Sequence, residues 1–153
     1  MPKQLRAVID VRATPERVWE VLTDFAAYPQ WNPFLTRVNG AARRGERLTI
    51  HMQPVGGRGM TFRPRVLDVD PSRRLSWLGR LLLPGVFDGE HSFNIEPLDD
   101  GRIRLVQQEV YRGLLVPFMA RSLDRHTLPA FEQMNRALKR RVEEHQRLEL
   151  SAP

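Results

Sequence analysis

The side chains best suited to chemistry lie on two predicted neighbouring strands, residues 87–97 and 102–112. Because side chains alternate along a strand, His91 shares a face with Phe93 and Ile95. The second strand carries three polar residues on one face: Gln107, Glu109 and Tyr111. An imidazole, an amide, a carboxylate and a phenol would then meet in one apolar pocket. Histidine titrates near neutrality and burial can raise the pKa of a carboxyl group, so such a set can polarise a carbonyl or move a proton in an aldol or dehydration step.

The same polar groups also have a purely structural interpretation. Buried polar side chains need partners, so His91 and Glu109 could bond one another or lie at the mouth of a cavity. Val106 and Val110, on the opposite face of their strand, leave its register open. We prefer the structural interpretation and carry ligand contact and catalysis forward as alternatives.

Aromatic side chains supply candidate walls for such a pocket. Apolar residues at regular spacing are core residues first, so each is expected singly in the core. Several together are expected to line a cavity. The candidates are Trp31, Phe62, Trp77, Phe93 and Phe118.

Several other chemistries are excluded by residue type and spacing. The chain has no cysteine, which rules out a thiolate nucleophile, a disulfide framework and any Cys-ligated metal. The remaining histidines lack metal-ligand spacing, and no serine has a nucleophile-elbow context. The run Gly56-Gly57-Arg58-Gly59 leads into a predicted strand, so it indicates a hairpin loop rather than a phosphate cradle. We expect neither a metal nor a cofactor.

The elements that hold these residues follow from the periodicity of the sequence. Residues 5–13 alternate as a strand, and Thr14-Pro15-Glu16 is typical of a helix start, with a hydroxyl cap and proline in the first turn. Asp24 is expected to cap a second short helix over residues 25–28. Six further strands, separated by turn residues, are predicted at 34–41, 46–54, 60–69, 73–82, 87–97 and 102–112.

A long amphipathic helix closes the predicted order. Its apolar positions recur at helical spacing from residue 117 to about 146, and Pro129 predicts a kink near residues 125–128. Pro84-Gly85 predicts a true break between two antiparallel strands. The sequence therefore predicts an α+β, helix-grip fold: a seven-stranded curved antiparallel sheet around a long C-terminal helix, with two short helices between strands 1 and 2.

Length and charge set the remaining bounds. The 153 residues suit one domain, predicted over 1–147, followed by a frayed tail over 148–153. The net charge of +6 comes mostly from scattered arginines, so we expect background composition rather than a nucleic-acid partner. No signal peptide and no stretch long enough to span a bilayer is evident, which favours a cytoplasmic location.

Several sequence segments resemble the START-like (SRPBCC, helix-grip) superfamily, in its polyketide cyclase/dehydrase-like branch. The segment VWEVLTDFAAYPQWNPF at 18–34 carries much of the resemblance, with Leu75-Ser-Trp77, Gly89-Glu-His91-Ser-Phe93 and Glu109-Val-Tyr111-Arg-Gly113. The segment MNRALKRRVE at 134–143 is similar to the end of the family's last helix. The resemblance implies an internal cavity between the sheet and the long helix, and it does not name the ligand.

Three functional hypotheses follow. The first is a binder or carrier, without catalysis, of an apolar small molecule that is lipid-like, acyl or aromatic, with His91, Gln107 and Glu109 orienting its polar end. The second is a polyketide cyclase/aromatase-like enzyme that uses the same pocket for acid-base chemistry. The third is an accessory protein that meets a partner, or makes peripheral contact with an anionic membrane, through the basic end of the long helix: Arg136, Lys139, Arg140 and Arg141.

Overall fold

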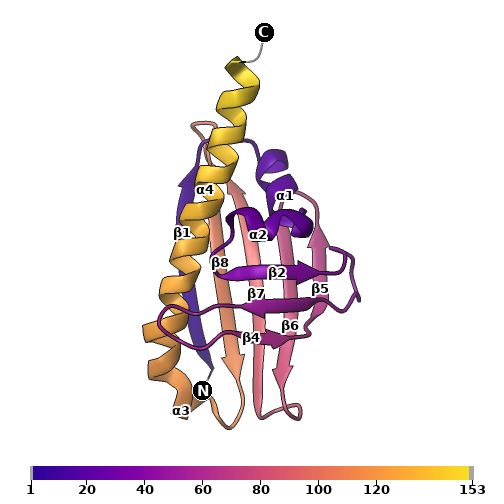
Figure 1. The fold of residues 1–153 in the computed structure, drawn as a ribbon, viewed down its shortest axis with the longest axis vertical. Coiled ribbons are helices and arrows are strands. Elements are labelled where there is room, and N and C mark those ends of the chain that lie inside the picture. The colour runs from indigo at the N-terminus through magenta and orange to yellow at the C-terminus, as the bar shows by residue number, and fades with distance from the viewer. Residues whose placement is uncertain (1, 152–153) are drawn as a thin grey trace.

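The computed structural model describes residues 2–151, apart from the side chains of residues 145 and 146. Figure 1 shows a long C-terminal helix lying along a curved sheet, with two short helices near its upper part. The strands are β1 (Lys3–Val11), β2 (Leu35–Asn39), β3 (Thr49–Met52), β4 (Met60–Phe62), β5 (Arg65–Asp70), β6 (Arg74–Leu81), β7 (Phe87–Pro97) and β8 (Ile103–Arg112). The helices are α1 (Pro15–Thr23), α2 (Tyr28–Trp31), α3 (Val116–Ser122) and α4 (Leu128–Ser151), with a 3-10 turn at Phe25–Ala27 and a π-helical turn at Leu123–Thr127.

The antiparallel helix-grip architecture is confirmed, but the strand count differs from the prediction. Five strands form one sheet in the order β1-β8-β7-β6-β5, and β2-β3-β4 form a second sheet. The predicted strand 60–69 is in fact two strands, because the chain changes sheets at Pro64, which has no N–H for a ladder. The Pro64 carbonyl instead accepts a hydrogen bond from the Leu48 amide at 2.8 Å.

The first helix begins as its sequence indicates. Pro15 is its first residue, and the Arg17 amide donates to the Thr14 hydroxyl at 3.2 Å. Asp24 makes no side-chain cap, so that prediction is wrong. The polar residue that organises this connector is Asn32, whose side-chain oxygen accepts from the amides of Phe34 and Leu35 at 3.0 and 2.9 Å and leads the chain into β2.

The long helix is interrupted where Pro129 predicts a kink. A proline cannot donate a hydrogen bond to the carbonyl one turn earlier. The helix instead forms a π-helical turn, in which the Leu128 amide donates to the Leu123 carbonyl. Helix α4 then runs to Ser151, beyond the predicted end near residue 146. Residues 148–151 are therefore helical, and residues 152–153 lie outside the described residues.

Gly85 marks the predicted break between two strands. Strand β6 ends at Leu81 and β7 begins at Phe87, and the two pair in register as an antiparallel hairpin. Gly85 has φ +86°, a backbone conformation that glycine adopts without steric cost. The prediction that Pro84-Gly85 separates two strands is confirmed.

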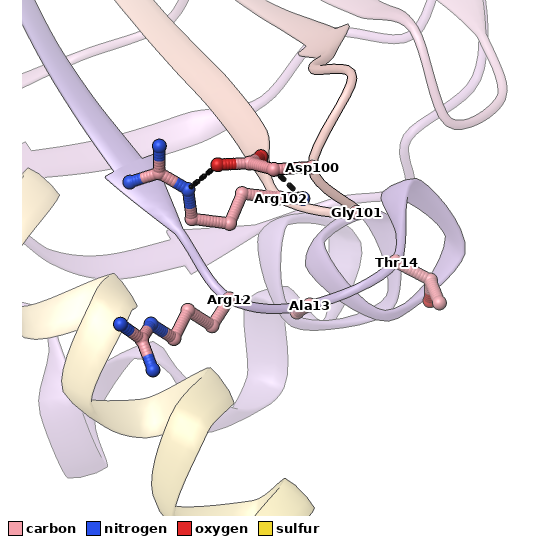
Figure 2. A pocket seen from close by; sticks show the side chains of 6 residues that line it. All are labelled: Arg12, Ala13, Thr14, Asp100, Gly101 and Arg102. Atoms are coloured by element: carbon pink, nitrogen blue, oxygen red, sulfur yellow. Dashed lines mark hydrogen bonds and ion pairs between the residues drawn. The ribbon is translucent and has the colours of Figure 1, made fainter.

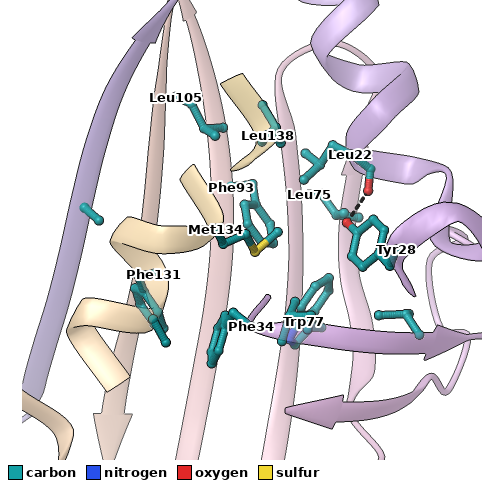
Figure 3. Close-up of a cluster of buried hydrophobic side chains, with 14 of the residues drawn as sticks. Leu22, Tyr28, Phe34, Leu75, Trp77, Phe93, Leu105, Phe131, Met134 and Leu138 are labelled. Atoms are coloured by element: carbon teal, nitrogen blue, oxygen red, sulfur yellow. Dashed lines mark hydrogen bonds between the residues drawn. The ribbon is translucent and has the colours of Figure 1, made fainter. Parts of the chain in front are cut away.

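The core lies between α4 and the concave face of the larger sheet. Figure 3 shows Phe131, Met134 and Leu138 of α4 opposite the buried sheet residues Phe93 and Leu105. These side chains are nearly inaccessible to solvent, so burial of apolar area is the main force that holds the helix to the sheet.

The short helices close one end of this core. The Tyr28 hydroxyl donates to the Leu22 carbonyl, a bond drawn in Figure 3. Burial raises the pKa of Tyr28, so its hydroxyl remains a donor. The bond ties α2 to the last turn of α1 beneath the sheet's concave face.

Candidate functional site

Strand register brings the predicted polar residues together. In the pairing of β7 with β8, His91 stands opposite Glu109, and Phe93 stands opposite Gln107. The His91 Nδ1 lies 3.2 Å from the Glu109 Oε2, and its Nε2 lies 3.1 Å from the Gln107 Oε1. His91 is buried, and Trp77 stacks on its ring with centroids 5.3 Å apart. The imidazole is thus held in plane between an amide and a carboxylate.

Helix α4 fixes the far end of this set. The Gln107 Nε2 donates to the Asn135 Oδ1 at 2.8 Å and to the Phe131 carbonyl at 3.3 Å. Gln107 is fully buried and Asn135 nearly so. Sequence reasoning missed Asn135, although a polar residue next to Met134 and one turn after Phe131 falls on the buried face of the helix.

These bonds determine where hydrogens must lie. The amide group of Gln107 is oriented by its two acceptors on α4, so its oxygen faces His91 and the His91 Nε2 carries a hydrogen. The Nδ1 then faces the Glu109 Oε2, within hydrogen-bond distance.

Tyr111 completes the network on the cavity side. Its hydroxyl donates to the Glu109 Oε2 at 2.7 Å. Burial, followed by the charge and hydrogen bond of Glu109, raises the pKa of Tyr111 well above its usual value. The phenol stays protonated and is a fixed donor at neutral pH.

A cavity of about 250 Å³ opens beside this network. Glu109 and Tyr111 line it, whereas His91 and Gln107 lie behind them in the core. Gly89 lines it too, and a Cβ at Gly89 would overlap the Glu109 Oε1. We call Gly89, Glu109 and Tyr111 the strand wall.

The opposite side of the cavity comes from a loop and the π-helical turn. The β3–β4 connection, residues 53–59, is the predicted hairpin loop. The Val55 amide donates to the His126 carbonyl at 2.9 Å, and the His126 Nδ1 donates to the Val55 carbonyl at 2.7 Å. We call residues 53–59 together with His126 the loop wall.

Sequence reasoning missed the loop wall as a cavity lining. His126 was set aside there because it has no metal-binding partner, and its contact with Val55 joins residues far apart in the chain. Further apolar lining comes from residues whose spacing gave no signal: Met52, Met60, Leu81, Phe87, Met119 and Leu123. Methionine adapts its shape readily, so this lining can change the shape of the cavity.

The predicted aromatic residues divide between the cavity and other places. Phe62 lines the cavity, whereas Trp77 and Phe93 are buried in the core around His91. Trp31 packs against Tyr28, with ring centroids 5.1 Å apart, away from the cavity. Phe118 was expected at the cavity wall but is 85% exposed, because α3 turns the neighbouring Met119 inward.

A second hollow lies at the other end of β1, and Figure 2 shows its lining. It measures about 610 Å³ but is an open depression among exposed side chains. Two of its three charged side chains pair with each other, since the Arg102 Nε lies 2.6 Å from the Asp100 Oδ2. The hydrogen bond from Arg102 lowers the pKa of the Asp100 carboxyl, so the pair stays ionised at neutral pH. We therefore place the candidate site in the smaller, more apolar cavity.

Two further observations concern the described residues only. None of their helices combines the length and hydrophobicity needed to cross a bilayer. They contain no cluster of three or more histidine, aspartate or glutamate side chains arranged to hold a metal ion.

The fold and the cavity beneath its long helix define the protein as a helix-grip protein. Residues 2–143 match the family described as "Polyketide cyclase / dehydrase and lipid transport". The chain belongs to this family, as the resemblance in its sequence indicates. No curated protein matches the chain.

Solved structures of the same fold come from varied organisms. A START superfamily protein from Mycobacterium smegmatis is 24% identical, with a TM-score of 0.71, covering 92% of this chain and 97% of its own. The Zhui aromatase/cyclase from Streptomyces sp. R1128 is 20% identical, with a TM-score of 0.64 and coverage of 92% and 96%. Norcoclaurine synthase from Thalictrum flavum is 14% identical, with a TM-score of 0.74 and coverage of 95% and 97%. These likenesses establish the fold, which hosts both binding and catalysis.

Proposed function

We propose that this protein binds and carries a small apolar molecule with one polar end in the cavity between the strand wall and the loop wall. The observation that carries the proposal is the contrast within the lining. Most of the surface is apolar, from methionine, leucine and phenylalanine side chains, while Glu109 and Tyr111 stand together on one wall. A mostly apolar pocket with a few converging polar groups is typical of a small-molecule site.

The size of the cavity limits the ligand. An apolar cavity of about 150 Å³ is large enough for benzene. At about 250 Å³, this cavity suits a one- or two-ring aromatic compound or a short acyl chain rather than a two-chain lipid. The loop wall is held by fewer hydrogen bonds than the strand ladder, so a longer ligand would displace residues 53–59 first.

The strand wall specifies the polar end. The Glu109 Oε2 already accepts from the Tyr111 hydroxyl and contacts the His91 Nδ1, so the Oε1 is the oxygen left for a ligand. The side chain of Glu109 is 15% exposed, toward the cavity. The free lone pairs of a carboxylate accept hydrogen bonds, so the preferred ligand carries a hydroxyl or amine donor.

Native mass spectrometry of the protein as purified tests the proposal first. The expected result is a retained small molecule, which is lost from a Met119→Trp variant that fills the cavity. Where nothing is retained, a panel of naphthols and their O-methyl ethers provides the probe. The free naphthols should bind and the ethers should bind at least tenfold more weakly, because they lack the donor. Equal binding of both series, or binding of neither, contradicts the proposal.

Glu109→Gln tests whether the Glu109 carboxylate binds the polar end of the ligand. The amide keeps the shape of the side chain and removes a charge, so thermal stability should change little or rise. Affinity for a naphthol should fall while affinity for its ether should not. A Glu20→Gln change, at an exposed position on α1, should leave both affinities unchanged.

A second candidate function is acid-base catalysis in the same cavity, as in a cyclase or dehydratase. The contact between the His91 Nδ1 and the Glu109 Oε2 favours it, because an imidazole next to a carboxyl group that lines the cavity can relay a proton. Turnover of a polyketone model compound, lost in His91→Phe, in Glu109→Gln and in Tyr111→Phe, would support catalysis. Binding without turnover in the unchanged protein would contradict catalysis and support carriage.

A further inference from the structure

One end of the molecule carries large apolar side chains that nothing covers. Leu82 and Leu83, at the tip of the β6–β7 hairpin, are 80% and 72% exposed. Leu114, between β8 and α3, and Phe118, on α3, are 77% and 85% exposed. We call these four residues the apolar tip. Single exposed apolar residues are common, but a group of four at one end of a molecule indicates an interaction surface.

The two loops of the apolar tip are fastened to each other. The Leu114 amide donates to the Gly85 carbonyl at 3.1 Å, and the Leu115 amide donates to the Val86 carbonyl at 3.0 Å. Figure 1 shows both loops at the lower end of the molecule, opposite the C-terminus. The side chains therefore project from one backbone platform rather than from independent loops.

Cationic side chains surround the apolar tip. Arg112 ends β8, and Arg121 lies three residues after Phe118 on α3, one turn along the same helix face. Both are exposed, and neither forms an ion pair within the part of the chain that the structure describes. Arg80 is also exposed but pairs with Asp88, with 3.7 Å between the Arg80 Nε and the Asp88 Oδ1. The rim of the tip thus carries net positive charge.

We propose that the apolar tip inserts into the surface of an anionic phospholipid membrane. Apolar side chains on a protruding tip bury themselves among acyl chains, and arginines at their base meet the phosphate layer. A second copy of this chain is a poorer occupant, because a two-fold contact would bring the arginine rims of both copies together.

The position of the cavity adds weight to this choice. Leu81 and Met119 line the cavity, and each is the chain neighbour of a residue of the apolar tip. A protein seated on a membrane by this tip would hold its cavity next to the acyl layer. The docking proposal goes beyond ligand carriage and does not depend on it, since its test uses no cavity ligand.

Cosedimentation with vesicles tests the proposal. The unchanged protein should bind vesicles of phosphatidylcholine and phosphatidylglycerol in equal amounts, and bind phosphatidylcholine alone about tenfold more weakly. Added salt should weaken the binding. The double variant Leu83→Ser/Phe118→Ser should lose about tenfold or more in partitioning, since two large apolar groups no longer insert.

Matched controls come from the opposite end of the chain. Leu148 and Leu150 are 69% and 80% exposed on the last turns of α4, and the variant Leu148→Ser/Leu150→Ser should bind vesicles like the unchanged protein. Arg112→Glu/Arg121→Glu should reduce binding, while Arg136→Glu/Arg140→Glu, on exposed α4 positions, should not.

Three results would overturn the proposal. The first is an absence of vesicle binding by the unchanged protein. The second is loss of binding in the α4 arginine variant with the tip variants unaffected. The third is a dimer in solution that Leu83→Ser/Phe118→Ser disperses without any effect on vesicles, which would assign the tip to a second copy. Circular dichroism confirms that each variant is folded.

Discussion

The two walls of the cavity are built by different means. The strand wall is part of a continuous antiparallel ladder between β7 and β8, and a buried network from Asn135 to Tyr111 lies behind it. The loop wall is held by two hydrogen bonds between Val55 and His126 and by one from the Gln53 amide to the Phe34 carbonyl. A ladder opens only with the sheet, whereas a loop held by a few bonds opens locally. We therefore expect the loop wall to open more readily than the strand wall.

The largest expected effect tests the rigidity of the strand wall. Gln107→Ala removes a fully buried amide and leaves the His91 Nε2 and the Asn135 Oδ1 without a partner, so the free energy of unfolding should fall by about 2–4 kcal/mol. Urea denaturation measures it. The half-buried neighbour Gln108, on the other face of β8, provides the control, and Gln108→Ala should cost under about 0.5 kcal/mol. Equal losses in the two variants would show that the network adds nothing to the wall.

A smaller effect is expected at the loop wall. His126→Ala removes one of the two bonds to Val55, and its cost should be about 1 kcal/mol of unfolding free energy. Trypsin cleavage after Arg58, in the freed loop, should speed up several-fold under native conditions. Cleavage at an unchanged rate would mean that the loop is held by something other than His126. His51→Ala, a histidine on β3 bonded to Thr61, is the matched variant and should leave cleavage after Arg58 nearly unchanged.

The smallest effect is an alkaline one, and it sharpens the role of Tyr111. A group whose pKa is raised in the folded state contributes stability that is fully present below its unfolded pKa, near 10.0, and is lost as the pH rises through the folded pKa. The melting temperature of the unchanged protein should therefore fall between pH 8 and pH 11. In Tyr111→Phe the fall should be smaller by a few degrees. Tyr28 remains in both proteins, so the difference reports Tyr111. Parallel pH profiles would mean that Tyr111 ionises freely in the folded state.

Local rules predicted the strand wall well. Alternation along the chain places His91, Gln107 and Tyr111 inward, and the structure confirms that register despite the apolar residues on the other face of β8. The helix start at Thr14 and the irregularity at Pro129 also follow from single residues with strong backbone preferences. Where one residue type dictates local geometry, the sequence suffices.

Contacts between distant segments were beyond the same rules. The link between Val55 and His126 spans 71 positions, and the sequence gives no sign of it. The position of Phe118 was predicted from its residue type, yet its exposure depends on how α3 meets the β8 loop. The split of residues 60–69 at Pro64 could have been foreseen, since proline interrupts a ladder. The pairing of the two halves in different sheets could not.

The π-helical turn at Leu123–Thr127 has a consequence for helical phase. One extra residue in a turn rotates everything before it by about 100° relative to everything after it. Because of that offset, Met119 of α3 points into the cavity while Phe131 of α4 points into the core. Deletion of a single residue from the turn would rotate α3 by about 100° relative to α4 and take Met119 off the cavity. The number of residues in this turn thus sets the angle between the side of α3 that faces the cavity and the side of α4 that faces the core.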